Sequence, residues 1–179
     1  MLLSASLAGC SGDKYSKKLI CENLYSGYNA SLSYVISDSE QEAYGSADIT
    51  KSDKTVLLFK QPQEYSGISI TSDSAYNPDI FIFELSGIPA NVPKSIAGDL
   101  TLMFSLFSDV IPSKLSQLSQ DCFSISEADG SVSAEFEENG MQYRINYNQS
   151  TGYPTSLSVG NDKSSVLITI EEFKTIKND

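Results

Sequence analysis

The sequence contains no histidine and a single arginine, Arg144. Histidine is the usual general base and the commonest metal ligand in proteins, so its absence excludes every catalytic triad that depends on an imidazole. The sequence also lacks a glycine-rich loop of the kinds that bind nucleotide phosphates. We therefore expect a protein that is not an enzyme, with no cofactor and no metal site.

Basic residues are scarce as a class. Twelve lysines and arginines stand against 23 acidic residues, which gives a formal net charge of -11. Because nucleic-acid binding depends on neutralising phosphates, no nucleic-acid partner is expected, and direct adhesion to anionic lipid headgroups is disfavoured for the same reason. After residue 10, no apolar run approaches the roughly 20 residues that span a bilayer.

Acidic residues are abundant enough to raise one enzymatic alternative. Two carboxylates are the minimum for glycoside hydrolysis, and Glu135 and Glu137 share one face of an expected strand. The other interpretation, which we favour, is a solvated acidic strand that discourages edge-to-edge pairing.

The N-terminus carries the most specific pattern in the chain. Small and apolar residues lead to a cysteine in the order Leu7-Ala8-Gly9-Cys10, which resembles a bacterial lipobox. The resemblance implies acylation of Cys10, and each buried methylene of an acyl chain contributes about 0.8 kcal/mol of membrane affinity. We therefore expect a signal-peptide remnant over residues 1–9, the acylated cysteine and a short tether over 10–13, and an extracytoplasmic domain anchored to the bacterial cell membrane. The alternative is an ordinary N-terminus in which Cys10 has no such role.

Two further cysteines remain, Cys21 and Cys122. Disulfides persist in extracytoplasmic compartments, and an even number of remaining cysteines allows a bridge between them. The alternative is two separate buried thiols, because free cysteine is among the most buried residue types. The sequence leaves both possibilities open.

Residues 14–179 have the pattern of a single α+β domain. Apolar residues recur every three or four positions from Lys14 to about Tyr28, the period of an amphipathic helix. From Ala30 the period changes to two, which predicts short antiparallel strands joined by turns, and Asn139-Gly140 is the strongest hairpin signal. Strands are expected at residues 30–37, 43–51, 55–60, 65–71, 80–85, 122–126, 131–137, 141–147, 155–159 and 164–174.

A second helix is expected from Ser95 to Ile111, after an irregular connection at residues 87–93, and Pro112 is expected to end it. Its apolar residues cover an arc of roughly 200°, wider than a surface helix needs. Either the helix fills the core under a curved sheet, or part of it faces a cavity that is open to apolar ligands. The second possibility predicts a cavity lined by Phe81, Phe83, Leu100, Met103, Phe104 and Phe107.

The order of these elements, together with a few short segments, points to a known type of fold. Lys60-Gln61-Pro62 ends a strand, and the runs at residues 143–147 (Tyr-Arg-Ile-Asn-Tyr) and 151–154 (Thr-Gly-Tyr-Pro) precede a closing strand pair. This arrangement resembles the LolA and LppX type of lipoprotein-handling proteins. The resemblance implies an open half-barrel, a strongly curved antiparallel sheet of about ten strands, wrapped over an N-terminal helix and a central apolar helix. It also implies that the concave face receives acyl chains.

Two functional hypotheses follow. The first is a membrane-anchored extracytoplasmic lipoprotein that binds or transfers a lipid or another apolar ligand in the concave face of the sheet. The second is a membrane-tethered interaction or structural module with no ligand cavity and an unidentified protein partner. The second hypothesis predicts an exposed patch at Tyr143, Tyr147 and Tyr153, because tyrosine is enriched at interfaces.

Overall fold

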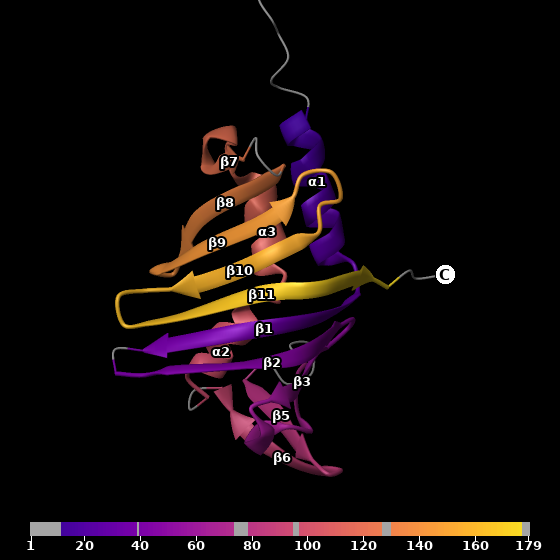
Figure 1. The fold of residues 1–179 in the computed structure, drawn as a ribbon, viewed down its shortest axis with the longest axis vertical. Coiled ribbons are helices and arrows are strands. Elements are labelled where there is room, and N and C mark those ends of the chain that lie inside the picture. Colours follow the sequence, from indigo (N-terminus) through magenta and orange to yellow (C-terminus); the bar gives the residue numbers. More distant parts are fainter. Residues whose placement is uncertain (1–11, 39, 74–78, 95–96, 127–129, 177–179) are drawn as a thin grey trace, which may run out of the picture.

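The computed structural model describes residues 12–38, 40–73, 79–94, 97–126 and 130–176. Within these residues eleven strands form one antiparallel sheet (Figure 1). The strands are β1 (Tyr28–Asp38), β2 (Glu42–Lys51), β3 (Thr55–Gln61), β4 (Ile68–Ser72), β5 (Ile80–Leu85), β6 (Ile88–Pro93), β7 (Phe123–Ile125), β8 (Ser131–Glu138), β9 (Met141–Asn148), β10 (Pro154–Gly160) and β11 (Ser164–Thr175). Their order across the sheet is β6-β5-β4-β3-β2-β1-β11-β10-β9-β8-β7.

The two halves of the chain form separate meanders that meet at the centre of the sheet. β1 and β11 pair from Tyr28 opposite Thr175 to Asp38 opposite Ser164. The earliest strand is therefore joined to the last one. The expected hairpin at Asn139-Gly140 is confirmed, and both residues have positive φ, 53° and 75°, as a two-residue type I′ turn requires.

β6 is a strand that the sequence pattern did not predict. The segment expected as an irregular connection pairs with β5 from Ile88 opposite Leu85 to Pro93 opposite Ile80. Proline lacks an amide donor, so it is tolerated only where no second strand needs that donor, as at the edge of a sheet. Pro89 and Pro93 thus mark β6 as an edge strand, and they also protect the edge against pairing with another chain.

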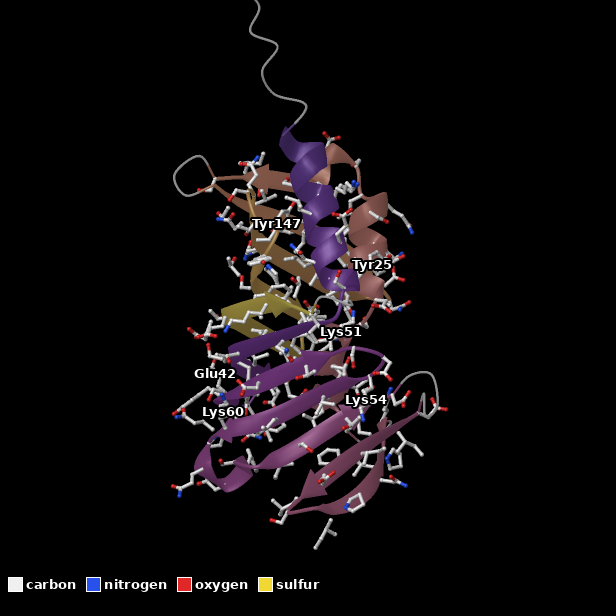
Figure 2. The ribbon with its side chains drawn as sticks, turned by 90° about the vertical axis from the view of Figure 1, so that its right-hand side faces the viewer. Tyr25, Glu42, Lys51, Lys54, Lys60 and Tyr147 are labelled. Atoms are coloured by element: carbon white, nitrogen blue, oxygen red, sulfur yellow. The ribbon has the colours of Figure 1, made fainter. Side chains whose placement is uncertain are left out.

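Three helices of the described residues lie on one face of the sheet (Figures 1 and 2): α1 (Gly12–Tyr25), α2 (Asp99–Ser105) and α3 (Val110–Gln117). Helix α1 begins two residues earlier than expected, so Gly12 and Asp13, at the end of the expected tether, are helical. The helix was expected to end at about Tyr28, but it ends at Tyr25, the backbone turns at Ser26 and Gly27, and Tyr28 opens β1. Cys10 and residues 1–9 lie outside the described residues.

The single helix expected from Ser95 to Ile111 is instead two short helices, α2 and α3. The amides of Leu106 and Phe107 donate to carbonyls only three residues back, at 3.2 and 3.1 Å, which tightens the chain at the end of α2. Pro112 does not end a helix but lies in the first turn of α3. Proline is tolerated there because the first amides of a helix have no acceptor within the helix.

The core lies between the helices and the concave face of the sheet. Ile20 and Leu24 of α1, Met103 of α2, and Ile111 and Leu115 of α3 are all buried. They pack on alternate side chains of the strands, such as Leu32, Ile49, Leu57, Ile145, Leu157 and Ile168. The expected fold class is confirmed: an α+β domain in which an open, curved antiparallel sheet wraps over helices.

One charged side chain, Lys51, is buried where the helices reach the sheet (Figure 2). Its ammonium group donates to the carbonyl oxygen of Leu24, near the end of α1, at 3.0 Å. It also pairs with the carboxylate of Asp109, immediately before α3, at 2.6 Å. Lys51 therefore links β2 to both helices.

Candidate apolar binding site

An apolar hollow of about 450 Å³ opens on the concave face of the sheet, beside the segment that leads into α2. A cavity of this size is within the range of small-molecule sites, about 300 to 1,000 Å³, which are lined mainly by apolar and aromatic side chains. Its lining residues come from β1 to β5, from the single helical turn at Gln63–Tyr65 and from residues 97–100. They are Tyr34, Ile36, Ala43, Phe59, Tyr65, Ile68, Ile70, Phe83, Ala97, Gly98, Asp99 and Leu100.

The period-two pattern of the strands places these side chains on one face. Tyr34 and Ile36 are two residues apart on β1, and Ile36 is opposite Ala43 on β2. Farther along the sheet, Ile70 of β4 is opposite Phe83 of β5. Because alternate residues of a strand point to the same face, these apolar side chains form a continuous wall.

Gly45 has no side chain at the place where Tyr34 of this wall crosses β2. It lies opposite Tyr34, and a Cβ atom at position 45 would come within 2.5 Å of the Tyr34 hydroxyl and 2.2 Å of the Gln61 carbonyl oxygen. Without that atom, the Tyr34 hydroxyl reaches across β2 and donates to the Gln61 carbonyl at 3.1 Å. The Tyr34 ring also packs edge-on against Phe59, with a centroid distance of 5.8 Å.

Asp99 is the one charged side chain among the described residues that line the hollow. The other ionisable groups there are the phenols of Tyr34 and Tyr65. Burial raises the pKa of Tyr34, and the nearby Tyr65 raises it further, so Tyr34 stays neutral at physiological pH. The hollow therefore presents apolar surface, aromatic rings and a single carboxylate.

The six residues predicted to line a cavity are divided by the structure. Phe83 and Leu100 line the hollow. Phe81, Met103, Phe104 and Phe107 are buried in the core, at most 7% exposed, and the rings of Phe81 and Phe104 are 4.7 Å apart. The lining residues on β1 to β4 belong to the expected strands, but no local pattern indicated that they face a space and not a packed helix.

Both cysteines are free thiols in the structure, so the disulfide allowed between Cys21 and Cys122 is not formed. The Cys21 thiol is 3.5 Å from the carbonyl oxygen of Pro112 in α3. Burial raises its pKa, which lowers its thiolate fraction and its reactivity. Cys122 lies 3.6 Å from the hydroxyl of Ser119.

The prediction that Tyr143, Tyr147 and Tyr153 form an exposed patch for a protein partner is wrong. Tyr143 and Tyr147 are 8% and 0% exposed, and of the three only Tyr153, at 38%, is exposed. The period of β9 explains the difference, since Tyr143 and Tyr147 point to the core while Arg144 lies on the outer face. The two acidic residues considered for catalysis have cross-strand partners, because Glu135 accepts a hydrogen bond from Arg144 and Glu137 accepts one from Gln142.

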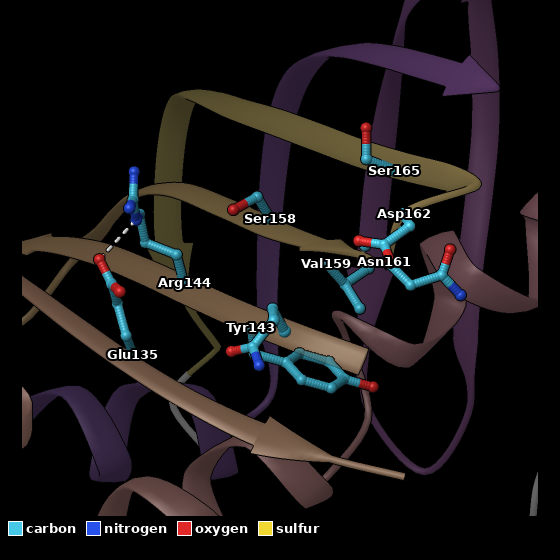
Figure 3. A pocket seen from close by; sticks show the side chains of 10 residues that line it. Glu135, Tyr143, Arg144, Ser158, Val159, Asn161, Asp162 and Ser165 are labelled. Atoms are coloured by element: carbon cyan, nitrogen blue, oxygen red, sulfur yellow. Dashed lines mark hydrogen bonds and ion pairs between the residues drawn. The ribbon is translucent and has the colours of Figure 1, made fainter. Parts of the chain in front are cut away.

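A second depression, of about 350 Å³, lies around β9, β10 and the turn that follows β10 (Figure 3). Seven of its ten lining residues are polar or charged, and they include Asn161, Asp162 and the ion pair between Arg144 and Glu135 at 2.8 Å. Both members of this pair are more than half exposed, and exposed ion pairs contribute little free energy. The apolar hollow is therefore the better candidate for a binding site.

The described part of the chain contains no group of three or more side chains that could together ligate a metal ion. Among the same residues, no helix is long and apolar enough to cross a membrane.

The fold recurs in solved structures of bacterial proteins. An uncharacterized conserved protein from Thermus thermophilus is similar with a TM-score of 0.54 at 9% identity, over 93% of this chain and 88% of that one. Lipoprotein LppX from Mycobacterium tuberculosis is similar with a TM-score of 0.48 at 10% identity, over 96% and 99%. A LolA superfamily protein from Nitrosomonas europaea gives 0.44 at 7% identity, over 93% and 94%.

LppX and a LolA superfamily protein are thus among the matched chains. At such low identities the likeness concerns the fold alone. The sequence matches no protein-family model and no curated protein.

Proposed function

We propose that this protein binds, or transfers to a partner, a lipid or another apolar ligand in the apolar hollow on the concave face of its sheet. The observation that carries the proposal is the lining of the hollow, which is apolar or aromatic at ten of its twelve positions, all except Gly98 and Asp99. Each methylene of a ligand that enters such a lining contributes about 0.8 kcal/mol. Full burial of about ten methylenes therefore contributes about 8 kcal/mol, which corresponds to micromolar affinity before the cost of association is subtracted.

The same residues explain why the hollow is not filled by the protein itself. Position 43 carries only an alanine, so this end of β2 adds almost no side-chain volume to the wall, whereas the space beside Gly45 is taken by the Tyr34 hydroxyl. Helices α1 and α3 pack side by side over the other half of the sheet (Figure 2). The wall of β1 to β5 near Ala43 therefore faces open space.

Filling the hollow from its own wall tests the proposal. Ala43→Trp adds an indole on the concave face, and Tyr44→Trp places the same group at the next residue, whose side chain is 75% exposed on the opposite face. The probe is N-phenyl-1-naphthylamine, a neutral fluorophore that brightens in apolar surroundings. We expect Ala43→Trp to weaken probe binding at least tenfold and Tyr44→Trp to leave it within twofold of the unaltered chain.

Native mass spectrometry of the gently extracted protein provides an independent measurement. We expect an apolar molecule to co-purify with the unaltered chain and with Tyr44→Trp, but not with Ala43→Trp. No bound probe, or equal probe binding by the two variants, would refute a ligand site in this hollow.

We further propose that the domain is extracytoplasmic and held at a membrane by an acyl chain on Cys10. Leu7-Ala8-Gly9-Cys10 supports this proposal, and α1 begins at Gly12, so the domain would lie close to the bilayer. Cys10→Ser should abolish labelling by a palmitate analogue and move the protein into the soluble fraction, whereas Cys122→Ser should change neither. Retention of the Cys10→Ser protein on membranes would contradict the anchor.

A further inference from the structure

We propose that the apolar hollow selects ligands by the charge of their head group, and that an apolar chain with a cationic head binds in preference to the same chain with an anionic head. Asp99 is the residue that determines this preference. The inference rests on the proposed function, because it concerns the same hollow.

The charges at the hollow have one sign. Asp99 contributes a carboxylate, and no lysine or arginine is among the described residues that line the hollow. The ammonium group of Lys94, five residues earlier, lies over the ring of Phe81 at 5.1 Å from its centroid. Neither Lys94 nor Phe81 lines the hollow. An anionic head would therefore meet a like charge with no compensating cation, whereas a cationic head would meet a counter-ion.

The aromatic lining favours the same choice. Tyr34, Phe59, Tyr65 and Phe83 all line the hollow, and the face of an aromatic ring attracts cations and is used to recognise quaternary ammonium groups. Tyr34 and Phe59 are in edge-to-face contact at 87° and are only 5% and 7% exposed, so Tyr65, at 54%, has the more accessible ring. A trimethylammonium head has an apolar surface as well as a charge, and it is compatible with both the rings and the carboxylate.

The start of α2 does not reverse this preference. Backbone amides at a helix start can bind an anion, and Asp99 is the first residue of α2. Here the amide of Leu100 donates to the Ala97 carbonyl and that of Thr101 to the Gly98 carbonyl, both at 3.0 Å. These donors are engaged within the turn, and Asp99 adds a negative charge to the first turn of α2.

The net charge of -11 also disfavours anions over the whole surface, so the test must separate Asp99 from general acidity. Asp99→Asn and Asp53→Asn change the net charge equally. Asp53 is exposed in the turn between β2 and β3, and it does not line the hollow. A difference between the two variants therefore reports the local effect.

The experiment uses the purified full chain and three competitors with the same decyl chain: decyltrimethylammonium, 1-decanol and decyl sulfate. Each displaces N-phenyl-1-naphthylamine at concentrations below micelle formation. We expect the ammonium compound to bind about fivefold to tenfold more tightly than the sulfate, as a charge contact of a few ångström at a partly exposed site allows. In Asp99→Asn this ratio should fall to about twofold or less, and in Asp53→Asn it should remain.

The outcomes separate this inference from the proposed function. If all three compounds bind equally and Ala43→Trp abolishes their binding, the hollow is a ligand site without head-group selection and the inference is overturned. If the preference survives equally in both asparagine variants, it arises from general acidity and the role of Asp99 is overturned. If no compound binds, or if Ala43→Trp has no effect, the proposed function itself fails.

Discussion

The side chains of the ion pair between Lys51 and Asp109 differ greatly in exposure to solvent. We therefore expect their removal to lower the free energy of unfolding by different amounts. The Lys51 side chain is 8% exposed and that of Asp109 is 72% exposed. Removing the lysine returns Asp109 to water, whereas removing the aspartate leaves an ammonium group enclosed by protein. An uncompensated buried charge costs more than the loss of a pair as a whole.

The magnitudes follow from the contacts. Lys51→Met keeps the packing of the methylene chain and loses the hydrogen bond to the Leu24 carbonyl, so we expect a loss of about 1 kcal/mol in the free energy of unfolding. Breaking a fully buried pair by removing one partner costs about 3 to 5 kcal/mol. In Asp109→Ala the ammonium group keeps the Leu24 carbonyl and slight access to solvent, so we expect a smaller loss of about 2 to 3 kcal/mol. Part of this, about 0.5 kcal/mol, is the loss of a negative charge at the start of α3.

Urea denaturation followed by far-ultraviolet circular dichroism measures each variant, and an unchanged slope against urea shows that the free energies are comparable. The double variant Lys51→Met/Asp109→Ala contains no buried charge at this site, so it should be only about 0.5 kcal/mol less stable than Lys51→Met. The coupling energy of the cycle is then about 2 kcal/mol. If Asp109→Ala were no more destabilising than Lys51→Met, the reasoning from exposure would be refuted.

Two further predictions concern Tyr28 and Gly45. Tyr28 is fully buried, and burial, followed by the charge of Asp109, raises its pKa above the ordinary value of 10.0. The folded state then holds a proton that the unfolded state loses, so this contribution to stability is complete below about pH 10 and is lost as the pH rises further. Between about pH 9.5 and about pH 11, the free energy of unfolding should fall in both proteins, but by about 1 kcal/mol less in Tyr28→Phe than in the unaltered chain. Parallel curves of unfolding free energy against pH for the two proteins would contradict this. Gly45→Ala should destabilise the fold by about 2 kcal/mol, because the added Cβ displaces the Tyr34 hydroxyl or the Gln61 backbone, and it should also weaken probe binding. Ser46→Ala is the control at the neighbouring position. Equal stability of the two variants would exclude the proposed role of Gly45.

Patterns local in sequence predicted most of the strands, because a period of two needs only neighbouring residues to be read. β1, β2, β3 and β5, together with β7 to β11, agree with their predicted bounds within about two residues. The errors arose where a residue type has two structural roles. Proline ends a helix or opens one, as Pro112 does, and it interrupts a strand or marks an edge, as Pro89 does.

The binding site depended much less on local pattern. Apolar side chains such as Phe104 and Leu100 follow the same helical period, yet one is buried in the core and the other lines the hollow. The importance of Gly45 depends on Tyr34 and Gln61, which approach it from neighbouring strands. The burial of Lys51 depends on two helices that end or begin far away in sequence.

The sequence by itself determined the absence of imidazole chemistry, the acidic surface, the alternation of the strands and the hairpin at Asn139-Gly140, because each of these is a property of composition or of adjacent residues. Only the tertiary structure decided which apolar face is filled and which remains open. Whether a side chain meets another side chain or empty space depends on the volumes that distant segments bring to the same place. Here β2 contributes almost no side-chain volume at Ala43, and α1 and α3 cover the other half of the sheet (Figure 2).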